Sequence, residues 1–312
     1  MNIVALAGGV GGAKLSEGLA QSVKPDNLTI IVNTGDDFEH LGLKISPDVD
    51  TVCYTLAGIA DPETGWGRAG ETWNTLSVLI ELGGPDWFRL GDHDLGTHLE
   101  RTRRLDAGES LSQITQTFCH VWGVKPSVIP MSDDPVSTQV ITDEGILPFQ
   151  EYFVHRQCQP HVTGFSFTGI DVARPAPGVL ESILRADLVV LCPSNPWVSI
   201  DPILAVSGIR EILKENNSPI IAVSPIIGGK AVKGPAAKMY TELGIPPSAR
   251  AVAQHYGNLL TGFVVDRIDA DNALTIQQLG LQILMTDTIM TTSGERRRLA
   301  EEVVEFGLNL IN

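Results

Sequence analysis

No run of apolar residues in this sequence approaches the roughly 20 that a helix needs to span a bilayer. The amino terminus also lacks the cationic segment of a secretion signal, and its short apolar stretch Met1–Ala7 runs directly into glycine-rich sequence. We therefore expect a cytoplasmic protein that does not bind a membrane. The 312 residues suffice for one large domain, or for a core domain with a smaller addition.

Positive charge is scarce as well. The chain has 22 lysines and arginines against 37 aspartates and glutamates, and its formal net charge is −15. This balance argues against nucleic acid as a partner, because nucleic acid binds basic surfaces. A small anionic ligand would need local cations, backbone N–H groups or a metal ion, so the few basic residues in loops become informative.

Motifs for zinc are missing. The cysteines Cys53, Cys119, Cys158 and Cys192 are far apart in the sequence and form no CxxC pair, which predicts reduced, buried thiols in a reducing compartment. His93 and His98 do not form an HExxH pattern, and we expect both on the surface. A Ser/His/Asp triad cannot be argued from sequence, because its spacing is spatial.

Short apolar runs alternate with helical patterns over much of the chain, which predicts an α/β fold with a Rossmann-like, mainly parallel sheet. The expected strands are Asn2–Ala7, Leu28–Asn33, Ser127–Met131, Leu188–Cys192, Pro219–Ser224, Thr261–Val265 and Leu281–Met285. The expected helices include Thr51–Ala60, Thr72–Leu82, two within Thr97–Trp122, one running from Pro196 through Leu213, and Ser293–Leu310 capped by Ser293.

The middle of the chain does not keep this rhythm. Val136–Thr142 and Ile146–Val154 flank Asp143-Glu144-Gly145, which is typical of a hairpin. We expect an inserted helical and hairpin region that covers the mouth of the sheet. The predicted division is a nucleotide-binding core from residues 1–60 and 179–312, with a cap or substrate region from 61–178.

The stretch Gly8–Lys14 lies between the first predicted strand and a helical pattern. Its glycines permit a tight turn and close approach of the backbone, a helix N-terminus presents free N–H groups to phosphate, and Lys14 adds a charge. The stretch lacks the third glycine of the GxGxxG motif, which argues against a dinucleotide-binding dehydrogenase. The GxxxxGK[ST] motif does not occur either, which argues against a Walker-type NTPase. We favour a phosphate-binding turn over a merely tight connection.

Carboxylates cluster after the second predicted strand. Asp36 and Asp37 come first, followed by Asp48 and Asp50 in a second loop. Carboxylates beside a phosphate site favour Mg²⁺, which takes oxygen ligands. For Asp50, helix capping is an equally good explanation, since it precedes an apolar run. Asp36 or Asp37 alone is more often a solvated turn residue.

Four further loops have unusual composition. Ser132–Val136 and Pro193–Pro196 offer short polar side chains at strand ends, although each alone is more often a turn. Pro225–Lys238 concentrates lysines in an acidic protein, which favours anion contact over a solvated loop. Trp87–Asp94 combines aromatic, basic and acidic residues that suit the wall of a pocket for a flat ring.

Taken together, these loops resemble the 2-phospho-L-lactate transferase family. The resembling segments occur in family order and run almost end to end, and they are Gly8–Lys14, Asn33–Asp37, Ser46–Thr51, Leu90–Asp94, Met131–Ser137, Pro193–Ile200, Val223–Lys238 and Met285–Thr288. Trp66-Gly67, Glu71–Asn74 and Pro85–Phe88 look closer to the actinobacterial-type branch, which leans toward an enolpyruvyl donor.

The resemblance implies an activity. Family members build coenzyme F420: the 5′-hydroxyl of the deazaflavin Fo attacks the terminal phosphorus of a guanosine diphosphate carrying lactate, GMP leaves and a phosphodiester results. Members similar to this chain use Mg²⁺, have a Rossmann-like core and form homodimers. Such transfer at phosphorus relies on positioning and charge neutralisation, which these loops supply.

The resemblance also implies roles for particular residues. Asp50 and Arg89 fall at the family's Fo-binding positions, and Trp87 would line the ring pocket. Asp37 and Asp50 would carry Mg²⁺, and Asp50 would orient the attacking hydroxyl, bind the metal or do both. The residues expected to hold the guanosine phosphates are Gly9, Gly11, Gly12, Lys14, Ser194, Asn195, Gly229 and Lys230.

Two other functions compete with the transferase. A related family of nucleotide-sugar-binding regulators of carbon metabolism shares the glycine turn, yet has no need of the deazaflavin pocket predicted around Arg89. An NAD(P)-dependent oxidoreductase is disfavoured by the missing third glycine and by Asn33-Thr34, which stand where an acidic residue would end the second strand.

Overall fold

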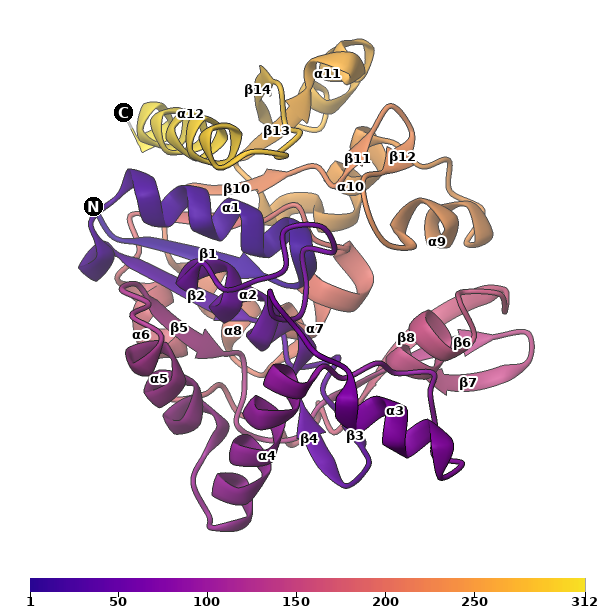
Figure 1. Ribbon diagram of the computed structural model, residues 1–312. Helices are drawn as coiled ribbons and strands as arrows, with labels where there is room; N and C mark the ends of the chain where they lie inside the picture. The colour runs from indigo at the N-terminus through magenta and orange to yellow at the C-terminus, as the bar shows by residue number, and fades with distance from the viewer. Residues whose placement is uncertain (312) are drawn as a thin grey trace.

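A seven-stranded parallel sheet forms the centre of the protein, which is described here over residues 1–311 of a computed structural model. Its strand order is β14-β13-β10-β9-β1-β2-β5 (Figure 1). The predicted α/β fold with a mainly parallel sheet is therefore confirmed. The strands are β1 (Ile3–Ala7), β2 (Leu28–Val32), β5 (Ser127–Pro130), β9 (Leu188–Leu191), β10 (Ile220–Val223), β13 (Gly262–Asp266) and β14 (Gln282–Thr286).

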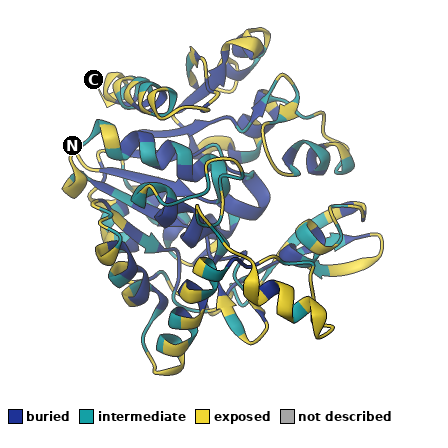
Figure 2. Ribbon diagram, in the orientation of Figure 1, coloured by how far each residue is buried: buried dark blue, intermediate teal, exposed yellow. Residues whose placement is uncertain are grey.

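The sheet is buried because helices cover both of its faces. On one face α1 (Gly9–Ser22) packs against α12 (Ser293–Ile311) and α2 (Pro47–Ala57). Gly18 of α1 allows this close approach, since a Cβ there would lie 2.1 Å from the carbonyl oxygen of Arg296. Figure 2 shows the sheet as the most continuously buried part of the molecule. Fully apolar strands such as β9 are typical of a sheet shielded from water on both sides.

The order of the strands reverses between β1 and β9. From β1 the chain moves to β2 and β5 on one side, while β9, β10, β13 and β14 lie on the other. β1 pairs with both β2 and β9 in parallel register, so that Leu6 lies beside Ile31 and Leu191. The turns that follow β1 and β9 therefore leave the sheet side by side, at the switch point where α/β proteins bind their ligands.

Two excursions from the sheet gather on one side of it (Figure 1). The first leaves after β2 and contains β3 (Phe38–His40), β4 (Leu43–Ile45), α3 (Asn74–Glu81), α4 (Asp92–Asp106) and α5 (Leu111–Val121). The second leaves after β5 and contains an antiparallel sheet of β6 (Ser137–Thr142), β7 (Gly145–Pro148) and β8 (Val162–Thr168). Between the two excursions, β5 returns to the central sheet, and the division into core and cap stays a prediction.

The remaining elements complete the layers around the sheet. They are the short helices η1 (Pro25–Asn27), η4 (Gly257–Leu259) and η5 (Arg267–Asp269), the helices α6 (Val179–Leu184), α9 (Ala236–Glu242), α10 (Ala249–Tyr256) and α11 (Ala270–Gln277), and the two-stranded ribbon β11 (Ile226–Ile227) and β12 (Lys230–Ala231). Among the described residues, no helix combines the length and apolarity that crossing a membrane demands.

Several predicted helix boundaries were wrong for local reasons. The helix expected from Thr51 begins at Pro47, since the first N–H groups of a helix have no partner within it and proline therefore loses no hydrogen bond there. The helix expected through Leu213 is broken into η3 (Pro196–Ile200), α7 (Asp201–Ala205) and α8 (Ile209–Glu215). Ser293 does not cap the last helix: the N–H of Glu295 donates to the hydroxyl oxygen of Thr292 at 3.2 Å.

The hairpin and the cysteines also need correction. The second arm of the hairpin ends at Pro148, because Glu151–His155 forms a helical turn (η2), and the third strand β8 was not predicted. Three cysteines are buried as expected, but Cys158 is only partly buried. Cys53 and Cys119, distant in sequence, bring their sulfur atoms to 3.4 Å in the space between α2 and α5.

Candidate functional site

A cleft of about 710 Å³ lies at the carboxyl ends of the strands, between the sheet and the inserted region. Lys14, Asp50, Arg89 and Asn195 all line this one cleft, although they are spread over most of the sequence. The other predicted site residues on its lining are Gly9, Gly11, Trp87 and Ser194. These eight residues therefore meet in one cleft, while their roles stay predictions.

The glycine turn joins β1 to α1 at the floor of the cleft. The N–H of Gly8 donates to the hydroxyl oxygen of Ser194 at 3.2 Å, and that hydroxyl donates to the carbonyl oxygen of Gly8 at 2.7 Å. A Cβ on Gly11 would lie 2.2 Å from the carbonyl oxygen of Pro193, so this position accepts only glycine. The N-terminus of α1, which is suited to bind an anion, is thereby held against the turn after β9.

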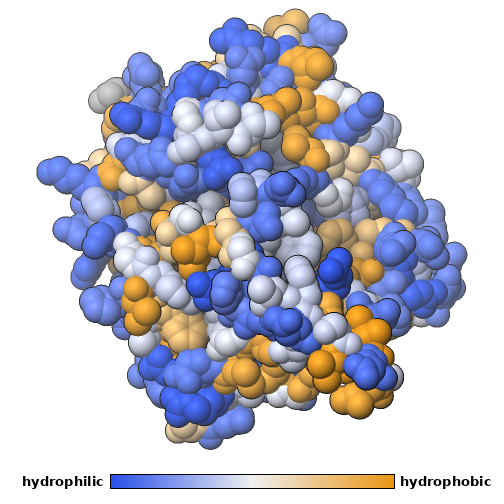
Figure 3. Space-filling model, in the orientation of Figure 1, coloured by the Kyte–Doolittle hydropathy of each residue, from blue (hydrophilic) through white to orange (hydrophobic). Residues whose placement is uncertain are grey.

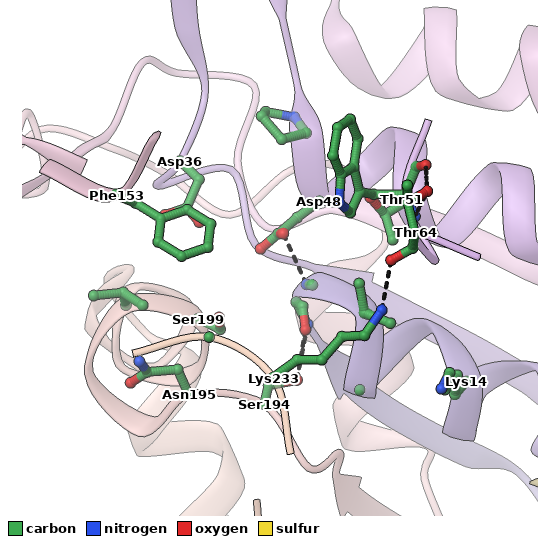
Figure 4. Close-up of a pocket in the computed structure, with 18 of the residues that line it drawn as sticks. Lys14, Asp36, Asp48, Thr51, Thr64, Phe153, Ser194, Asn195, Ser199 and Lys233 are labelled. Atoms are coloured by element: carbon green, nitrogen blue, oxygen red, sulfur yellow. Dashed lines mark hydrogen bonds between the residues drawn. The ribbon is translucent and has the colours of Figure 1, made fainter. Parts of the chain in front are cut away.

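Gly12 and Asn195 serve the packing of these two turns. Gly12 is buried beneath the cleft rather than lining it, and a Cβ there would lie 2.8 Å from the hydroxyl oxygen of Ser194. The side-chain oxygen of Asn195 accepts the N–H of Trp197 at 3.1 Å and so caps η3. Asn195 nevertheless faces the cleft, as Figure 4 shows, with Ser194 next to it.

Asp48 lies directly above the N-terminus of α1. It accepts the N–H of Gly9 at 2.7 Å (Figure 4), and it also accepts the side-chain amide of Asn33 at 2.9 Å. Burial raises the pKa of Asp48 to about 6. Burial, followed by the charge of Asp48, also raises the pKa of Asp36 well above its ordinary value. Both carboxyls line the cleft, and one oxygen of Asp36 is buried without a hydrogen-bond partner.

The carboxylate oxygens of Asp36 and Asp48 are suitable ligands for a hard cation. The two carboxyls are buried, the charge of Asp48 contributes to the raised pKa of Asp36, and Mg²⁺ prefers oxygen ligands. The predicted ligand Asp37 does not line the cleft. Its carboxylate accepts the hydroxyl of Ser46 at 2.7 Å, because the turn after β2 points neighbouring side chains in different directions. Sequence reasoning noticed Asp36 and Asp48 but could not tell which carboxyls face the cleft.

Asp50 belongs to a second, fully buried network. The helix begins at Pro47, so Asp50 stands in the first turn of α2 and is not an N-cap. One of its oxygens accepts a hydrogen bond from the Arg101 guanidinium. Burial raises the pKa of Asp50, and the charge of Arg101 acts in the opposite direction. His98, which we expected on the surface, is 2% exposed and lies with its Nδ1 3.7 Å from the second oxygen.

Asp94 and Tyr54 extend this network toward the cleft. The Tyr54 hydroxyl donates to Asp94 at 2.7 Å, and the same oxygen of Asp94 lies 3.5 Å from Nε2 of His98. The ligand atoms of Asp50, Asp94 and His98 lie within 4.8 Å of one another, which is close enough to hold a metal ion. The positive charge of Arg101 already neutralises part of the negative charge of this cluster. Asp36 and Asp48 therefore offer the better cation site.

Two lysines bring positive charge to the cleft. Lys14 extends from the second turn of α1, and burial, followed by the charges of Arg296 and Lys233, lowers its pKa. Lys233 donates to the carbonyl oxygen of Thr64 at 2.6 Å and so spans the cleft (Figure 4). Gly229 and Lys230, predicted to bind phosphate, do not line the cleft, because the β11–β12 ribbon turns at Gly228-Gly229 and leaves Lys230 exposed.

Aromatic side chains form the wall of the cleft on the side of the inserted region. Trp87 stacks on His155 with ring centroids 5.1 Å apart, and it also contacts Phe38 and Phe88. The guanidinium of Arg89 lies 4.5 Å from the ring centroid of Trp73. Aromatic side chains therefore gather around Trp87, and their use as the wall of a ring pocket stays a prediction. Further aromatic residues that line the cleft are Tyr54, Trp66, Phe149 and Phe153.

One predicted loop is structural. The backbone N–H and hydroxyl of Ser112 donate to Asp133 at 2.7 and 2.8 Å, which fixes the start of α5. The N–H of Arg174 donates to Asp134 at 2.9 Å. Ser132–Val136 does not line the cleft. This loop is thus a turn, the more frequent of the two alternatives.

Comparison with known proteins places the chain in a family. The sequence profile described as "2-phospho-L-lactate transferase CofD" matches residues 3–296. This chain belongs to that family. The phosphoenolpyruvate transferase of Kitasatospora aureofaciens is 46% identical over 312 residues, covering 96% of this chain and 97% of that protein. The 2-phospho-L-lactate transferase of Methanosarcina mazei is 38% identical over 303 residues, covering 97% and 99%.

Membership of the 2-phospho-L-lactate transferase family makes this chain an enzyme, a transferase, as the sequence segments indicated. It removes the oxidoreductase alternative. A solved structure from Bacillus halodurans, described as a member of the upf0052 family, superposes with a TM-score of 0.64 at 18% identity, covering 97% of this chain and 99% of that one. At this identity the likeness shows the fold alone.

Proposed function

We propose that the cleft transfers a phosphate-linked three-carbon group from a guanosine diphosphate donor to the 5′-hydroxyl of Fo, a step in coenzyme F420 biosynthesis. The observation that supports this function is the meeting of Lys14, Asp50, Arg89 and Asn195 in one cleft. An acidic pair, a glycine turn and an aromatic wall surround the same space. In-line transfer at phosphorus needs both reactants held in one orientation, and these groups provide that.

The donor would lie on the sheet side of the cleft. Backbone N–H groups at the N-terminus of α1 are suited to its phosphates, and Ser194 would hold the glycine turn in place beside them. Lys14 and Lys233 would balance the charge that builds up on the phosphate oxygens during transfer. Gly11 and Gly12 contribute indirectly, because their missing side chains let the turns after β1 and β9 meet.

Mg²⁺ would be held by Asp36 and Asp48, the two carboxyls that face the phosphate turn. When bound, it would neutralise phosphate charge that otherwise repels the attacking hydroxyl. The N–H of Gly9 holds one oxygen of Asp48, which fixes the carboxylate beside the turn. We no longer place Asp37 among the ligands, since its carboxylate is directed at Ser46 and away from the cleft.

The acceptor would lie on the side of the inserted region. The wall around Trp87 is suited to stack on the deazaflavin ring, and Arg89 to contact its polar edge. One oxygen of Asp50 is buried without a hydrogen-bond partner, and Asp50 lines the cleft. That oxygen would accept the hydrogen bond of the 5′-hydroxyl and aim the nucleophile at phosphorus.

The relatives support a proposal for the identity of the three-carbon group. The Kitasatospora aureofaciens protein, named a phosphoenolpyruvate transferase, is more similar to this chain than the Methanosarcina mazei protein, named a 2-phospho-L-lactate transferase. We therefore propose an enolpyruvyl donor, with dehydro-F420-0 and GMP as products. We also propose a cytoplasmic homodimer, whose association would cover apolar side chains that are exposed on α3 and directly after it, Val78, Ile80 and Leu82. Figure 3 shows apolar surface at the lower right of the molecule, on the side where α3 lies in Figure 1.

Release of GMP tests the proposed function. The protein is incubated with Mg²⁺ and the enolpyruvyl guanosine diphosphate donor, with and without Fo, and GMP is measured by chromatography. We expect GMP only when Fo is present, and none after chelation of the metal with EDTA. Binding of both ligands without release of GMP would instead indicate the nucleotide-binding regulator, and full activity in metal-free buffer would remove Mg²⁺ from the account.

A further inference from the structure

Arg101 is buried deep beside the cleft. It lies on α4, in the inserted region, and is 1% exposed, which makes it one of the largest fully buried side chains among the described residues. A buried guanidinium is costly unless its charge and its N–H groups find partners. None of the roles proposed above uses Arg101. Its position therefore calls for an explanation.

The partners of Arg101 come from its own helix and from three other elements. One terminal nitrogen donates to Asp50 of α2. The other donates to Nδ1 of His98 at 3.0 Å and lies 3.5 Å from the carbonyl oxygen of Lys44 in β4. The guanidinium also lies 5.9 Å from the ring centroid of Phe118 on α5. Arg101 thus fixes α2 relative to the inserted helices.

As a result, the two oxygens of Asp50 differ in their hydrogen bonds. Oδ1 is taken by Arg101, while Oδ2 has no hydrogen-bond partner. His98 does not fill this gap, since its Nδ1 already accepts from Arg101 and lies 3.7 Å from Oδ2, too far for a hydrogen bond. Asp50 faces the cleft, and so it offers one free acceptor oxygen to a ligand.

We propose that Arg101 is a positioning residue, which holds the Asp50 carboxylate as a fixed anion with one oxygen directed at the hydroxyl of the acceptor. This inference rests on the proposed function and deepens it, because it separates the two roles that sequence left open for Asp50. The ion pair assigns Asp50 to the acceptor hydroxyl, and Asp36 and Asp48 to the cation. A cation bound at Asp50 would lie beside the guanidinium and be repelled by it.

A merely structural arginine makes different predictions. If Arg101 only joined α4 to α2, its loss would lower the stability of the fold and weaken the binding of both substrates to the same extent. If it acts through Asp50, its loss affects the acceptor and the rate of transfer, while the phosphate turn of α1 still binds the donor. Arg101 and Asp50 would also act as one unit, so that removing both costs no more activity than removing Asp50.

The test uses five variants of the full chain: Arg101→Met, Arg101→Lys, Asp50→Asn, the double variant D50N/R101M and the control Arg103→Met. Arg103 lies on the same helix, and its side chain is exposed and pairs only with Glu100 among the described residues. Fo affinity is followed by fluorescence, GDP affinity by calorimetry, the fold by thermal melting, and kcat and KM by GMP release.

We expect R101M to lower kcat about 100-fold and to weaken Fo binding, with GDP affinity unchanged within about twofold. D50N/R101M should be no slower than D50N, and R103M should match the wild type. R101M could unfold because the charge of Asp50 is left unpaired. In that case kcat and Fo affinity are compared in two other variants: D50N/R101M, which buries no charge at this pair, and R101K, which keeps the positive charge. R101K should turn over faster than D50N, since it still pairs with Asp50.

Three results would overturn the inference: wild-type kcat and Fo affinity in R101M, equal loss of Fo and GDP affinity, or a double variant whose loss is the product of the single losses. Failure of the proposed function itself is distinguishable. In that case the wild-type protein would release no GMP with Fo and donor, whatever the variants do.

Discussion

Lys233 donates its ammonium group to the carbonyl oxygen of Thr64 at 2.6 Å, and this hydrogen bond joins the two sides of the cleft. Thr64 belongs to the turn-rich segment 61–70, and Gly65 of that segment lies against Val10 of the phosphate turn. A phosphate in the cleft would be a stronger partner for Lys233 than a neutral carbonyl. Binding of the donor would then exchange one partner of this lysine for another.

Substitution of Lys233 tests this exchange. We expect Lys233→Met to raise KM for the donor about 10-fold or more, because a charge-assisted hydrogen bond is lost, with little change in Fo affinity. Steady-state kinetics with each substrate varied in turn measures the effect. Lys214→Met, at an exposed position on α8, is the matched control. An unchanged donor KM would exclude Lys233 from the phosphate site.

The glycine turn predicts a steric effect with an internal control. Gly11→Ala places a Cβ 2.2 Å from the carbonyl oxygen of Pro193, so that the turns after β1 and β9 must move apart. We expect a loss of about 1–3 kcal/mol in unfolding free energy and loss of donor binding. Gly96→Ala on α4 meets nothing within 4 Å and should stabilise the helix slightly. Equal behaviour of the two variants would contradict the close packing of the turns.

The buried acidic pair predicts how stability depends on pH in the absence of metal. Burial raises the pKa of Asp48 to about 6 in the folded protein, whereas the unfolded chain loses this proton near pH 4. The folded state therefore binds more protons between these values, and its stability falls as pH rises from about 4 to about 6. Burial also raises the pKa of Asp36, and this shift acts in the same direction.

Denaturant unfolding in EDTA at pH 5 and pH 7.5 measures this dependence. The contribution of Asp48 is on the order of 2 kcal/mol, and Asp48→Asn should remove most of it. Asp171→Asn, at an exposed position, is the control. Added Mg²⁺ should restore stability at pH 7.5 in the wild type and not in D48N. A wild-type protein as stable at pH 7.5 as at pH 5 would contradict the assignment of Asp48.

Arg89 tests the acceptor side independently. Its guanidinium lies over the ring of Trp73. We expect Arg89→Ala to weaken Fo binding about 10-fold or more, as measured by fluorescence titration, while calorimetry finds GDP affinity unchanged. The same loss of affinity for both ligands would mean that the acceptor pocket lies elsewhere in the cleft.

Much of the central sheet could be predicted because the sequence of each strand is recognisable without knowledge of its neighbours. β9 and β10 are apolar throughout, as strands shielded on both faces are, and glycine or polar turns mark their ends. β8 was missed, since Val162–Thr168 mixes apolar and polar residues around a glycine and is only partly buried. Its place as a strand depends on pairing with β6, which the sequence of β8 alone does not specify.

The site was predictable as a set of loops, but less so as individual side chains. Parallel strands bring their carboxyl ends together, so convergence of the loops followed from the fold class. Which lysine faces the cleft depends on the turn at Gly228-Gly229, which takes Lys230 out of the site and leaves Lys233 in it. Arg101 resembled an exposed residue of a polar helix, because its partner Asp50 lies 51 positions away in another element.

The mass of the deazaflavin product tests the central claim most directly. Fo, Mg²⁺ and the enolpyruvyl guanosine diphosphate donor are incubated with the protein, and the products are separated and measured by mass spectrometry. The account predicts a phosphodiester of Fo with the three-carbon group, formed in equal amount with GMP and abolished by Asp50→Asn. Unmodified Fo after complete incubation with the wild-type protein, or GMP formed without any new deazaflavin, would contradict it.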